Sequence, residues 1–326
     1  MTRPHVLILH VGGTIGMRRT PSGYGTHPGH LAELLQSMPE LQRPELPAWD
    51  LHEFDPLLDS AEMTPDDWLR IAETLVGRQN DYDGFVVLHG TDTMAYTAAA
   101  LDRLLLGVHK PVVLTGSQIP LFEVRNDARE NLINALTFAA TPDLHEVCIA
   151  FDDVLLQAST ATKVSSFDLH AFDAPNSAPL AHVGVGVRWQ QTPTGGGHGP
   201  MHLRPHERRR VLSIRLYPGL TADMLRNVLQ DPIDALILEM YGAGNGPRDP
   251  NVLAALEAAH ARGVRLVAVS QTPSGGVNLA DYETGQAYAR VGVESWGRAT
   301  TEAALAALTL SVKEQTPMLE PSHEAS

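Results

Sequence analysis

The sequence is poor in the features that mark secreted, membrane-bound or nucleic-acid-binding proteins. It holds a single cysteine, Cys148, so no disulfide can form within the chain, and its apolar surroundings indicate a core position. No stretch approaches the roughly 20 apolar residues that a membrane span needs. Acidic residues outnumber basic ones by 38 to 24, which disfavours both a nucleic-acid partner and docking on an anionic membrane. We therefore expect a cytoplasmic protein with neither kind of partner.

The common motifs of cofactor and metal enzymes are also missing. The sequence has no GxGxxG fingerprint, no Walker A loop, no HExxH helix and no GxSxG elbow. Its 15 histidines are scattered rather than grouped at metal-ligand spacing. The sequence therefore predicts neither a metal nor an organic cofactor.

What is present is an alternation of apolar runs with segments of helical spacing. The chain has 326 residues, 43% of them hydrophobic and 19% charged, which suits a soluble protein of two domains. The first apolar run is broken by His10 and leads into a glycine turn, so we interpret it as a strand rather than a signal peptide. The N-terminal half is expected to hold buried parallel strands at 6–11, 85–88, 112–114 and 147–151, with helices from Thr64 onward and at 93–106 and 127–140.

Residues 192–206 interrupt this alternation with a run rich in glycine, proline and histidine, which is typical of a linker. We predict a larger N-terminal flavodoxin-like domain with a parallel sheet (1–191), a linker (192–210) and a smaller C-terminal α/β domain (211–326). The C-terminal domain is expected to hold strands at 211–216, 235–240 and 266–270, with helices at 221–229, 249–261 and 301–312.

Two strand ends carry threonine beside glycine. The loop GGTIG contains Thr14 and follows the first strand, and the loop HGTDT contains Thr91 and follows strand 85–88. Ligands of open α/β sheets bind at the carboxyl ends of strands, and glycine allows close approach to the backbone. Each loop alone is typical of an ordinary strand-to-helix turn, which is the better interpretation of an isolated GGTIG, so the pair favours a site without establishing one.

Two further segments have both a functional and an ordinary interpretation. Residues 18–30 form a long stretch rich in glycine and proline, which predicts a mobile lid carrying Tyr24. Lys163 could relay protons beside a threonine and a carboxylate such as Asp92. Tyr24 could equally be an exposed loop aromatic, whereas an ordinary surface lysine is the commoner interpretation of Lys163.

Taken together, the motifs resemble the bacterial-type L-asparaginases, and their cytosolic type I branch in particular. The resemblance extends over nearly the whole chain. Its segments are GGTIG (12–16), DSAEMT (59–64), YDGF (82–85), HGTDTM (89–94), TGSQIP (115–120) and YGAGN (241–245).

This resemblance implies catalytic roles for five residues. Thr14 would be the nucleophile that forms a β-aspartyl ester, and Tyr24 would close over it from the lid. Thr91, Asp92 and Lys163 would form a second cluster that assists proton movement. A threonine hydroxyl is a poor nucleophile at neutral pH, so such activation is needed.

The resemblance also implies how L-asparagine is held. Asp59, Ser60 and Ala61 would bind its α-amino and α-carboxyl ends, and Asp92 would bind the ammonium as well. Amides of the Gly90–Thr91 loop would stabilise the oxyanion. The family assembles as homodimers or homotetramers, and Asn245 would contribute to the site of a neighbouring subunit.

Some type I members carry a second asparagine site for allosteric activation. An arginine and a cysteine common in those members are replaced here by Met240 and Pro273, so we expect no such regulation.

Three alternatives stay open. A glutaminase-asparaginase would use the same machinery, because one methylene is worth only about 1–3 kcal/mol in a pocket. An amidotransferase subunit would need an extra domain and a basic surface. A non-catalytic amino-acid-binding protein would not need both threonines and Lys163.

Overall fold

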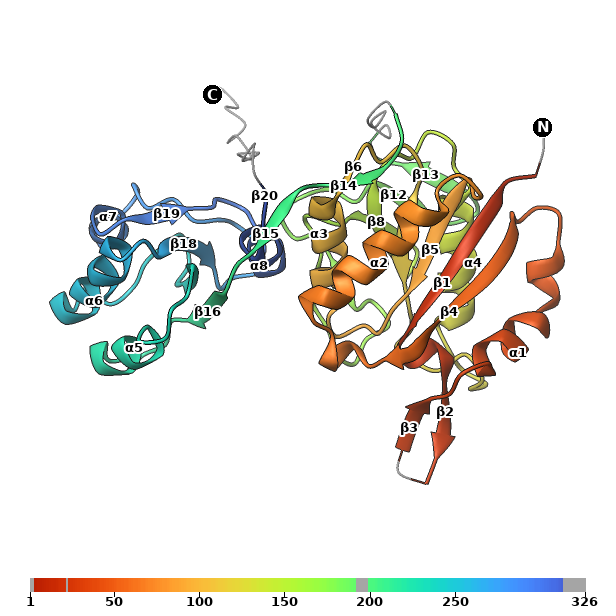
Figure 1. Cartoon of the computed structure of the whole chain (residues 1–326), viewed down its shortest axis with the longest axis horizontal. Coiled ribbons are helices and arrows are strands. Elements are labelled where there is room, and N and C mark those ends of the chain that lie inside the picture. Colours follow the sequence, from red (N-terminus) through yellow and green to blue (C-terminus); the bar gives the residue numbers. More distant parts are fainter. Residues whose placement is uncertain (1–2, 22, 192–198, 313–326) are drawn as a thin grey trace. The chain divides into compact units, whose positions relative to one another are not determined.

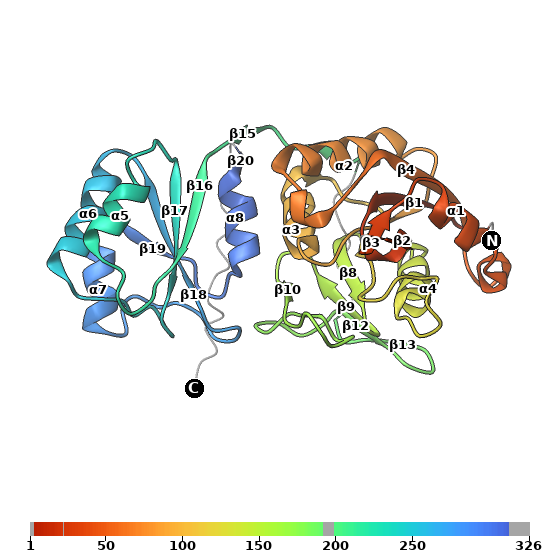
Figure 2. The same cartoon turned by 90° about the horizontal axis from the view of Figure 1, so that it is seen from below.

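The computed structural model describes residues 3–21, 23–191 and 199–312. The chain divides into two compact units, Met1–Arg204 and Pro205–Ser326, each with its own sheet and helices (Figures 1 and 2). The units are described separately below.

The N-terminal unit is built on an eight-stranded sheet of order β13-β12-β9-β8-β7-β5-β1-β4. The strands from β4 to β8 pair in parallel, while β9, β12 and β13 extend the sheet in antiparallel fashion. The strands are β1 (His5–Gly12), β4 (Ala48–Leu58), β5 (Gly84–Leu88), β7 (Val112–Thr115), β8 (Val147–Phe151), β9 (Val154–Gln157), β12 (Ala181–Val183) and β13 (Val187–Trp189).

The order of the five parallel strands places a topological switch point between β1 and β5. The chain leaves β1 for β4 on one side and then crosses to β5 on the other, which is the 2-1-3-4-5 order of flavodoxin-like folds. The predicted α/β fold with a flavodoxin-like N-terminal sheet is therefore confirmed. The carboxyl ends of β1 and β5 are the expected place for a ligand site.

Helices cover both faces of this sheet because the strands are apolar on both faces. Helices α1 and α4 pack against one set of strand side chains, which includes Val6, Ile8 and Val86. Helices α2 and α3 lie on the opposite side (Figure 2). The helix bounds are α1 (His30–Gln36), α2 (Pro65–Arg78), α3 (Met94–Leu104) and α4 (Ala128–Ala139), with short 3-10 turns η1 (Thr14–Gly16), η2 (Pro39–Gln42) and η3 (Ser60–Glu62).

Helix α2 begins where its sequence predicts. Pro65 occupies the first turn, and the Asp67 carboxylate accepts hydrogen bonds from the backbone amide (2.8 Å) and the hydroxyl (2.6 Å) of Thr64.

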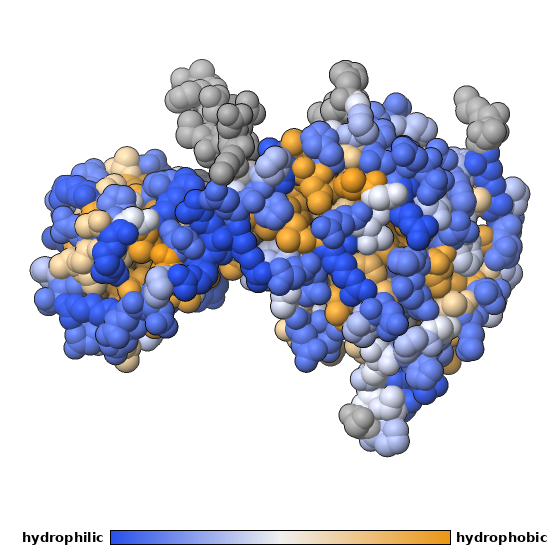
Figure 3. All heavy atoms as spheres, in the orientation of Figure 1, coloured by the Kyte–Doolittle hydropathy of each residue, from blue (hydrophilic) through white to orange (hydrophobic). Residues whose placement is uncertain are grey.

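Two N-terminal segments differ from their predicted structure. The helix predicted over 93–106 ends at Leu104, because Leu105–Leu106 (β6) pair with His202–Leu203 (β14). The segment 18–30, predicted as a long loop, instead holds a hairpin of β2 (Met17–Thr20) and β3 (Gly23–Thr26). This hairpin projects from the unit (Figure 1), and its surface is mostly hydrophilic or intermediate in character (Figure 3).

The C-terminal unit holds a four-stranded parallel sheet of order β16-β17-β18-β19. One face packs against α5, α6 and α7, and the other packs against α8. The elements are β16 (Val211–Arg215), α5 (Ala222–Val228), β17 (Ala235–Met240), α6 (Pro250–Ala261), β18 (Arg265–Ser270), α7 (Glu283–Arg290), β19 (Val293–Ser295) and α8 (Thr301–Thr309).

The last helix is shorter than the predicted 301–312. Leu310 leaves the helical conformation at φ −102° and ψ 64°, and Leu310–Val312 (β20) pair with His206–Arg208 (β15). The predicted linker 192–210 lies partly outside the described residues, at 192–198. Its described part carries β14 and β15, and the boundary between the units falls inside it, between Arg204 and Pro205. Within the described ranges, no helix is long and apolar enough to cross a membrane.

Candidate active site

The two threonine loops meet at the switch point. Strands β1 and β5 pair in register up to His10 and Leu88, so the loops that follow them leave the sheet side by side. Gly13 has a φ of +95°, and a Cβ there would lie 2.3 Å from the amide nitrogen of Gly90. Only glycine permits this approach. The contact brings the backbone that carries Thr14 against the backbone that carries Thr91.

The segment after β4 joins them from the other side of β1. Ser60 is 4% exposed, and a Cβ on Gly90 would lie 2.4 Å from its hydroxyl oxygen. Its carbonyl accepts a hydrogen bond of 2.7 Å from the Thr93 hydroxyl, while the Asp59 carboxylate accepts one of 3.0 Å from the Ala61 amide. Ser60 is therefore held against Gly90, and the role of Asp59, Ser60 and Ala61 in substrate binding stays a prediction.

Lys163 connects the second threonine to a carboxylate. It lies on β10 (Thr162–Lys163), which pairs with β11 (Phe172–Asp173) in a separate two-stranded ribbon. Its Nζ donates to Thr91 Oγ1 at 2.8 Å and to Asp92 Oδ1 at 2.7 Å. Thr91 is 7% exposed, while the Asp92 side chain is 66% exposed and its carboxylate can reach a ligand. Three residues separated by up to 72 positions in sequence thus form one hydrogen-bonded cluster.

Thr14 lies at the start of η1, directly after the glycines. Within the described ranges, its hydroxyl makes no hydrogen bond, so its proton is not committed to another protein group. The turn is fixed from outside by the Leu121 amide, which donates to the Ile15 carbonyl at 3.2 Å. An uncommitted hydroxyl on a fixed turn is suited to a nucleophile.

Tyr24 is on β3 of the projecting hairpin and is 47% exposed. Its hydroxyl donates to Glu123 Oε1 at 2.9 Å and accepts from Arg19 at 3.3 Å, and its ring meets Phe122 edge-on at 6.2 Å. These contacts hold the hairpin against the segment after β7. The predicted approach of Tyr24 to Thr14 stays a prediction.

His89 fixes the second loop from inside the protein, a role that sequence reasoning did not assign. It is fully buried, and burial lowers the pKa of its imidazole to about 4. Its Nδ1 lies 2.7 Å from the Gly90 carbonyl, which can only accept, so the neutral ring carries its proton on Nδ1. Nε2 then accepts from the Thr97 hydroxyl at 2.9 Å. The ring thereby orients the peptide that precedes Thr91.

Gln118 and Asp127 also went unassigned. The Thr91 hydroxyl donates to Gln118 Oε1 at 3.2 Å. The Asp127 carboxylate, 8% exposed, accepts from the backbone amides of Gln118 at 2.9 Å and Ile119 at 3.0 Å. The only sequence signal was their place in and just after the TGSQIP segment.

Asn245 belongs to the other unit. It closes a tight turn after β17, in which its backbone exchanges two hydrogen bonds of 2.9 Å with Tyr241, and its side-chain oxygen accepts from the Thr284 hydroxyl. Its assignment to the site of a neighbouring subunit stays a prediction.

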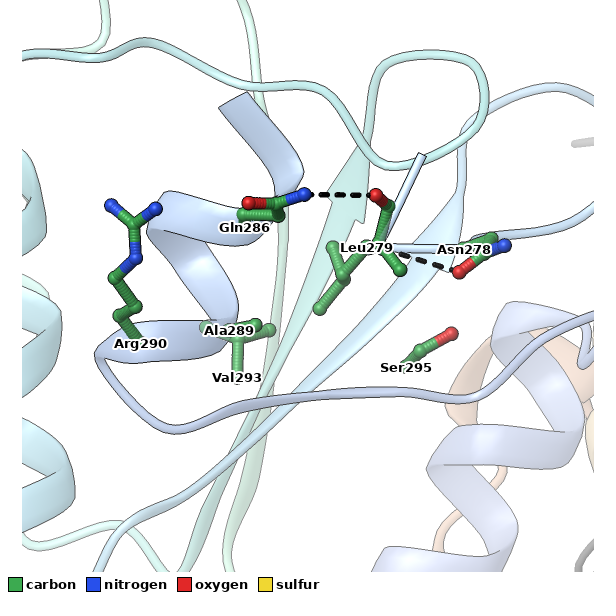
Figure 4. A pocket seen from close by; sticks show the side chains of 8 residues that line it. Asn278, Leu279, Gln286, Ala289, Arg290, Val293 and Ser295 are labelled. Atoms are coloured by element: carbon green, nitrogen blue, oxygen red, sulfur yellow. Dashed lines mark hydrogen bonds between the residues drawn. The ribbon is translucent and has the colours of Figure 1, made fainter. Parts of the chain in front are cut away.

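A hollow of about 610 Å³ lies in the C-terminal unit beside α7 and β19 (Figure 4). Arg290 is its one charged residue, and Gln286 and Asn278 are engaged with neighbouring groups of their own loop and helix. Its one hydroxyl, that of Ser295, donates to the Val277 carbonyl at 2.6 Å. Over the described residues, no group of three or more His, Cys, Asp or Glu side chains is arranged to hold a metal ion.

The sequence matches two family models. Residues 5–195 match the N-terminal asparaginase domain, and residues 210–320 match the glutaminase/asparaginase C-terminal domain. L-asparaginase 1 of Escherichia coli K12 is 44% identical over 309 residues, which cover 94% of this chain and 91% of that protein.

Two solved structures are similar to this chain over nearly its whole length. L-asparaginase I from Vibrio cholerae superposes with a TM-score of 0.87 at 40% identity, covering 95% of this chain and 92% of that one. The thermostable L-asparaginase from Thermococcus kodakarensis gives a TM-score of 0.83 at 35% identity, covering 94% and 92%.

Proposed function

This chain belongs to the asparaginase family, and on that basis we propose that it hydrolyses the side-chain amide of L-asparagine to give L-aspartate and ammonia. The predicted resemblance to the type I branch is confirmed by the 44% identity with L-asparaginase 1. Membership in a family of amidohydrolases also sets aside the binding-protein alternative.

The observation that carries the mechanism is the position of Lys163 Nζ, 2.8 Å from Thr91 Oγ1 and 2.7 Å from Asp92 Oδ1. The loop that carries Thr14 is in backbone contact with the loop that carries Thr91, through Gly13 and Gly90. A hydroxyl, an ammonium and a carboxylate joined in this way can move protons during two successive acyl transfers.

In the first step, the Thr14 oxygen attacks the carbon of the substrate amide. The carbon–nitrogen bond breaks, the proton of the Thr14 hydroxyl is passed to the leaving nitrogen, and ammonia departs. Thr14 then carries a β-aspartyl ester. Tyr24, closing from the hairpin, would polarise the Thr14 hydroxyl, and the amides of Gly90 and Thr91 would donate to the oxyanion.

In the second step, water attacks the ester carbonyl. One of its protons is taken up through the Thr91 cluster and passed to the Thr14 oxygen as the bond between that oxygen and the acyl carbon breaks, so Thr14 regains its hydroxyl and L-aspartate is released. We assign Lys163 and Asp92 to proton movement around Thr91 in this step.

Free asparagine is a zwitterion, so its binding needs a carboxylate for the ammonium and donors for the α-carboxylate. The exposed carboxylate of Asp92 suits the first requirement, with Asp59 as a second acceptor. The hydroxyl of Ser60 suits the second, whereas the amide of Ala61 already donates to the Asp59 carboxylate at 3.0 Å.

We further propose that the protein is cytoplasmic and works as a homodimer or homotetramer. In such an assembly, Asn245 would reach the site of a neighbouring subunit. The glutaminase-asparaginase alternative differs in the length of substrate accepted. Values of kcat/KM for L-asparagine and L-glutamine, measured side by side, decide between them.

The proposal is tested by ammonia release from L-asparagine. Wild type is compared with Thr14→Ala, Thr91→Val and Lys163→Met, and Thr137→Ala serves as control because it removes a threonine hydroxyl from an exposed helix position. The three site variants are expected to lose on the order of 10³-fold or more in kcat while staying folded. An inert wild type, or a Thr14→Ala variant of normal activity, would refute the proposal.

A further inference from the structure

We infer that Gln118 is a positioning residue for the proposed reaction, because it directs the hydroxyl proton of Thr91 and leaves one lone pair of the hydroxyl oxygen free to act on water or substrate. The inference rests on the proposed function and adds a residue to which no role has been assigned.

The direction of each hydrogen bond around Gln118 follows from its partners. The Gln118 amide lies 3.2 Å from the backbone carbonyl of Asp168, which can only accept. The amide nitrogen must therefore face Asp168, and the side-chain oxygen must face Thr91. The oxygen has no proton to give, so the Thr91 hydroxyl is the donor in that contact.

The other contact of Thr91 completes the argument. A lysine ammonium has three donors and no acceptor, so Lys163 donates to Thr91 Oγ1 across 2.8 Å. The Thr91 oxygen thus receives one hydrogen bond from Lys163 and gives one to Gln118. A hydroxyl oxygen has two lone pairs, which leaves one lone pair for a substrate or water.

The backbone of Gln118 is anchored independently of the cluster. The Asp127 carboxylate holds the amide of Gln118 at 2.9 Å and that of Ile119 at 3.0 Å. Asn131, 2% exposed, donates to Asp127 at 3.2 Å and to the Gly116 carbonyl at 3.0 Å. Because the backbone of Gln118 is fixed in this way, its side chain can keep one orientation.

The far end of the side chain is anchored on the segment that carries Lys163. Asp168 lies between β10 and β11, and its amide donates to the Ser165 hydroxyl at 2.9 Å. The Ser165 hydroxyl in turn donates to the Asp168 carboxylate at 3.0 Å. Gln118 therefore joins the loop after β7 to the β10–β11 ribbon, with the Thr91 hydroxyl between them.

The test compares two replacements of Gln118. Gln118→Met keeps the length of the side chain but removes both polar atoms, so the Thr91 proton loses its acceptor. We expect kcat to fall by roughly 10–100-fold, within the range of acid–base contributions, with KM changed less than about 3-fold. Gln118→Glu keeps an acceptor oxygen, and we expect it to recover most of kcat at neutral pH. In a plot of kcat against pH, Gln118→Glu should show a new acidic limb, a decrease in kcat where the introduced carboxylate titrates. Wild type and Gln118→Met should lack this limb.

Gln190→Met is the matched control, because Gln190 is exposed and lies at the end of β13 in the same unit. Melting temperature and active-site titration correct each kcat for the folded fraction. If corrected kcat is normal in Gln118→Met, or if Gln118→Glu shows no recovery and no new limb, the positioning role is overturned while the proposed function stands. An inert wild type would overturn both.

Discussion

Gly13 and Gly90 lie so close that a methyl group on the first would come 2.3 Å from the amide nitrogen of the second. The contact joins the ends of the two strands that flank the switch point, and each glycine is followed directly by a threonine. The backbone segments that carry the two proposed catalytic threonines are therefore in direct contact.

Gly13→Ala is expected to destabilise the protein and abolish activity. Alanine at a φ of +95° is strained by roughly 1–3 kcal/mol, and its methyl group would push the loops apart. Displacements of about 1 Å can cost on the order of 10²-fold in rate. Steady-state kinetics and thermal unfolding measure the two effects. Gly263→Ala is the control, because Gly263 has a φ of +91° with open space around it. Equal effects of both substitutions would show that conformation alone matters.

Asp127→Ala is expected to lower the free energy of unfolding by about 2–5 kcal/mol, because it leaves two backbone amides without their acceptor. Activity should fall as well, since those amides belong to Gln118 and Ile119. Chemical denaturation gives the stability change. The exposed Asp143→Ala substitution should change stability by less than about 0.5 kcal/mol. A small effect of Asp127→Ala would contradict this account of the loop.

His89 predicts a loss of stability at acidic pH. Its folded pKa of about 4 lies below the ordinary value of 6.5, so the unfolded chain binds the proton first. Stability from this group is therefore complete above pH 6.5 and declines as the pH falls toward 4, by up to about 3 kcal/mol.

The measurement for His89 is the free energy of unfolding at several pH values in that window. Glutamine at position 89 does not titrate. The decrease in the free energy of unfolding on acidification should therefore be smaller in His89→Gln than in wild type, by the contribution of His89. The exposed His182→Gln variant should follow wild type. Parallel curves for wild type and His89→Gln would refute the prediction.

The hairpin makes a separate prediction. Glu123→Ala removes the acceptor of the Tyr24 hydroxyl, and we expect kcat/KM to fall by roughly 10-fold because the hairpin loses its anchor. Glu123→Gln keeps an acceptor oxygen and should retain most activity, as should Glu45→Ala at an exposed ion pair. If Glu123→Ala retains normal kinetics, the contact with Tyr24 has no role in catalysis.

Kinetics should be hyperbolic in asparagine concentration. Met240 is fully buried in the core of the C-terminal unit, and Gln271 is occupied by the carbonyls of Leu216 and Glu239 at 2.5 and 2.8 Å. Met240 therefore offers no accessible group to a second asparagine, and the amide nitrogen of Gln271 is committed to the backbone. Initial rates over a wide range of concentration test this expectation, and a sigmoidal curve would contradict it.

Local sequence patterns were sufficient to predict most elements whose conformation depends on neighbouring residues alone. Continuous apolar runs predicted β5, β7 and β8, and the Thr64–Pro65 pair predicted the start of α2. The failures came where pairing with a distant segment decides the local structure. Leu105–Leu106 leave their predicted helix to pair with β14, and Leu310–Val312 do the same with β15. The β2–β3 hairpin was missed because Gly23 and Gly25 lower the strand signal of its residues.

By itself, the sequence determined that the chain has two α/β units, which residues form β1 and β5, and which threonines follow those two strands. These features depend on hydrophobic periodicity and turn chemistry, which act over a few residues. Strand β4, which leads to Asp59 and Ser60, was not predicted. Only the tertiary structure decided that Lys163 reaches Thr91 and Asp92, that His89 orients the Gly90 carbonyl, and that Gln118 accepts a hydrogen bond from the Thr91 hydroxyl. Those contacts depend on the order of strands in the sheet, which brings together residues that are distant in the chain.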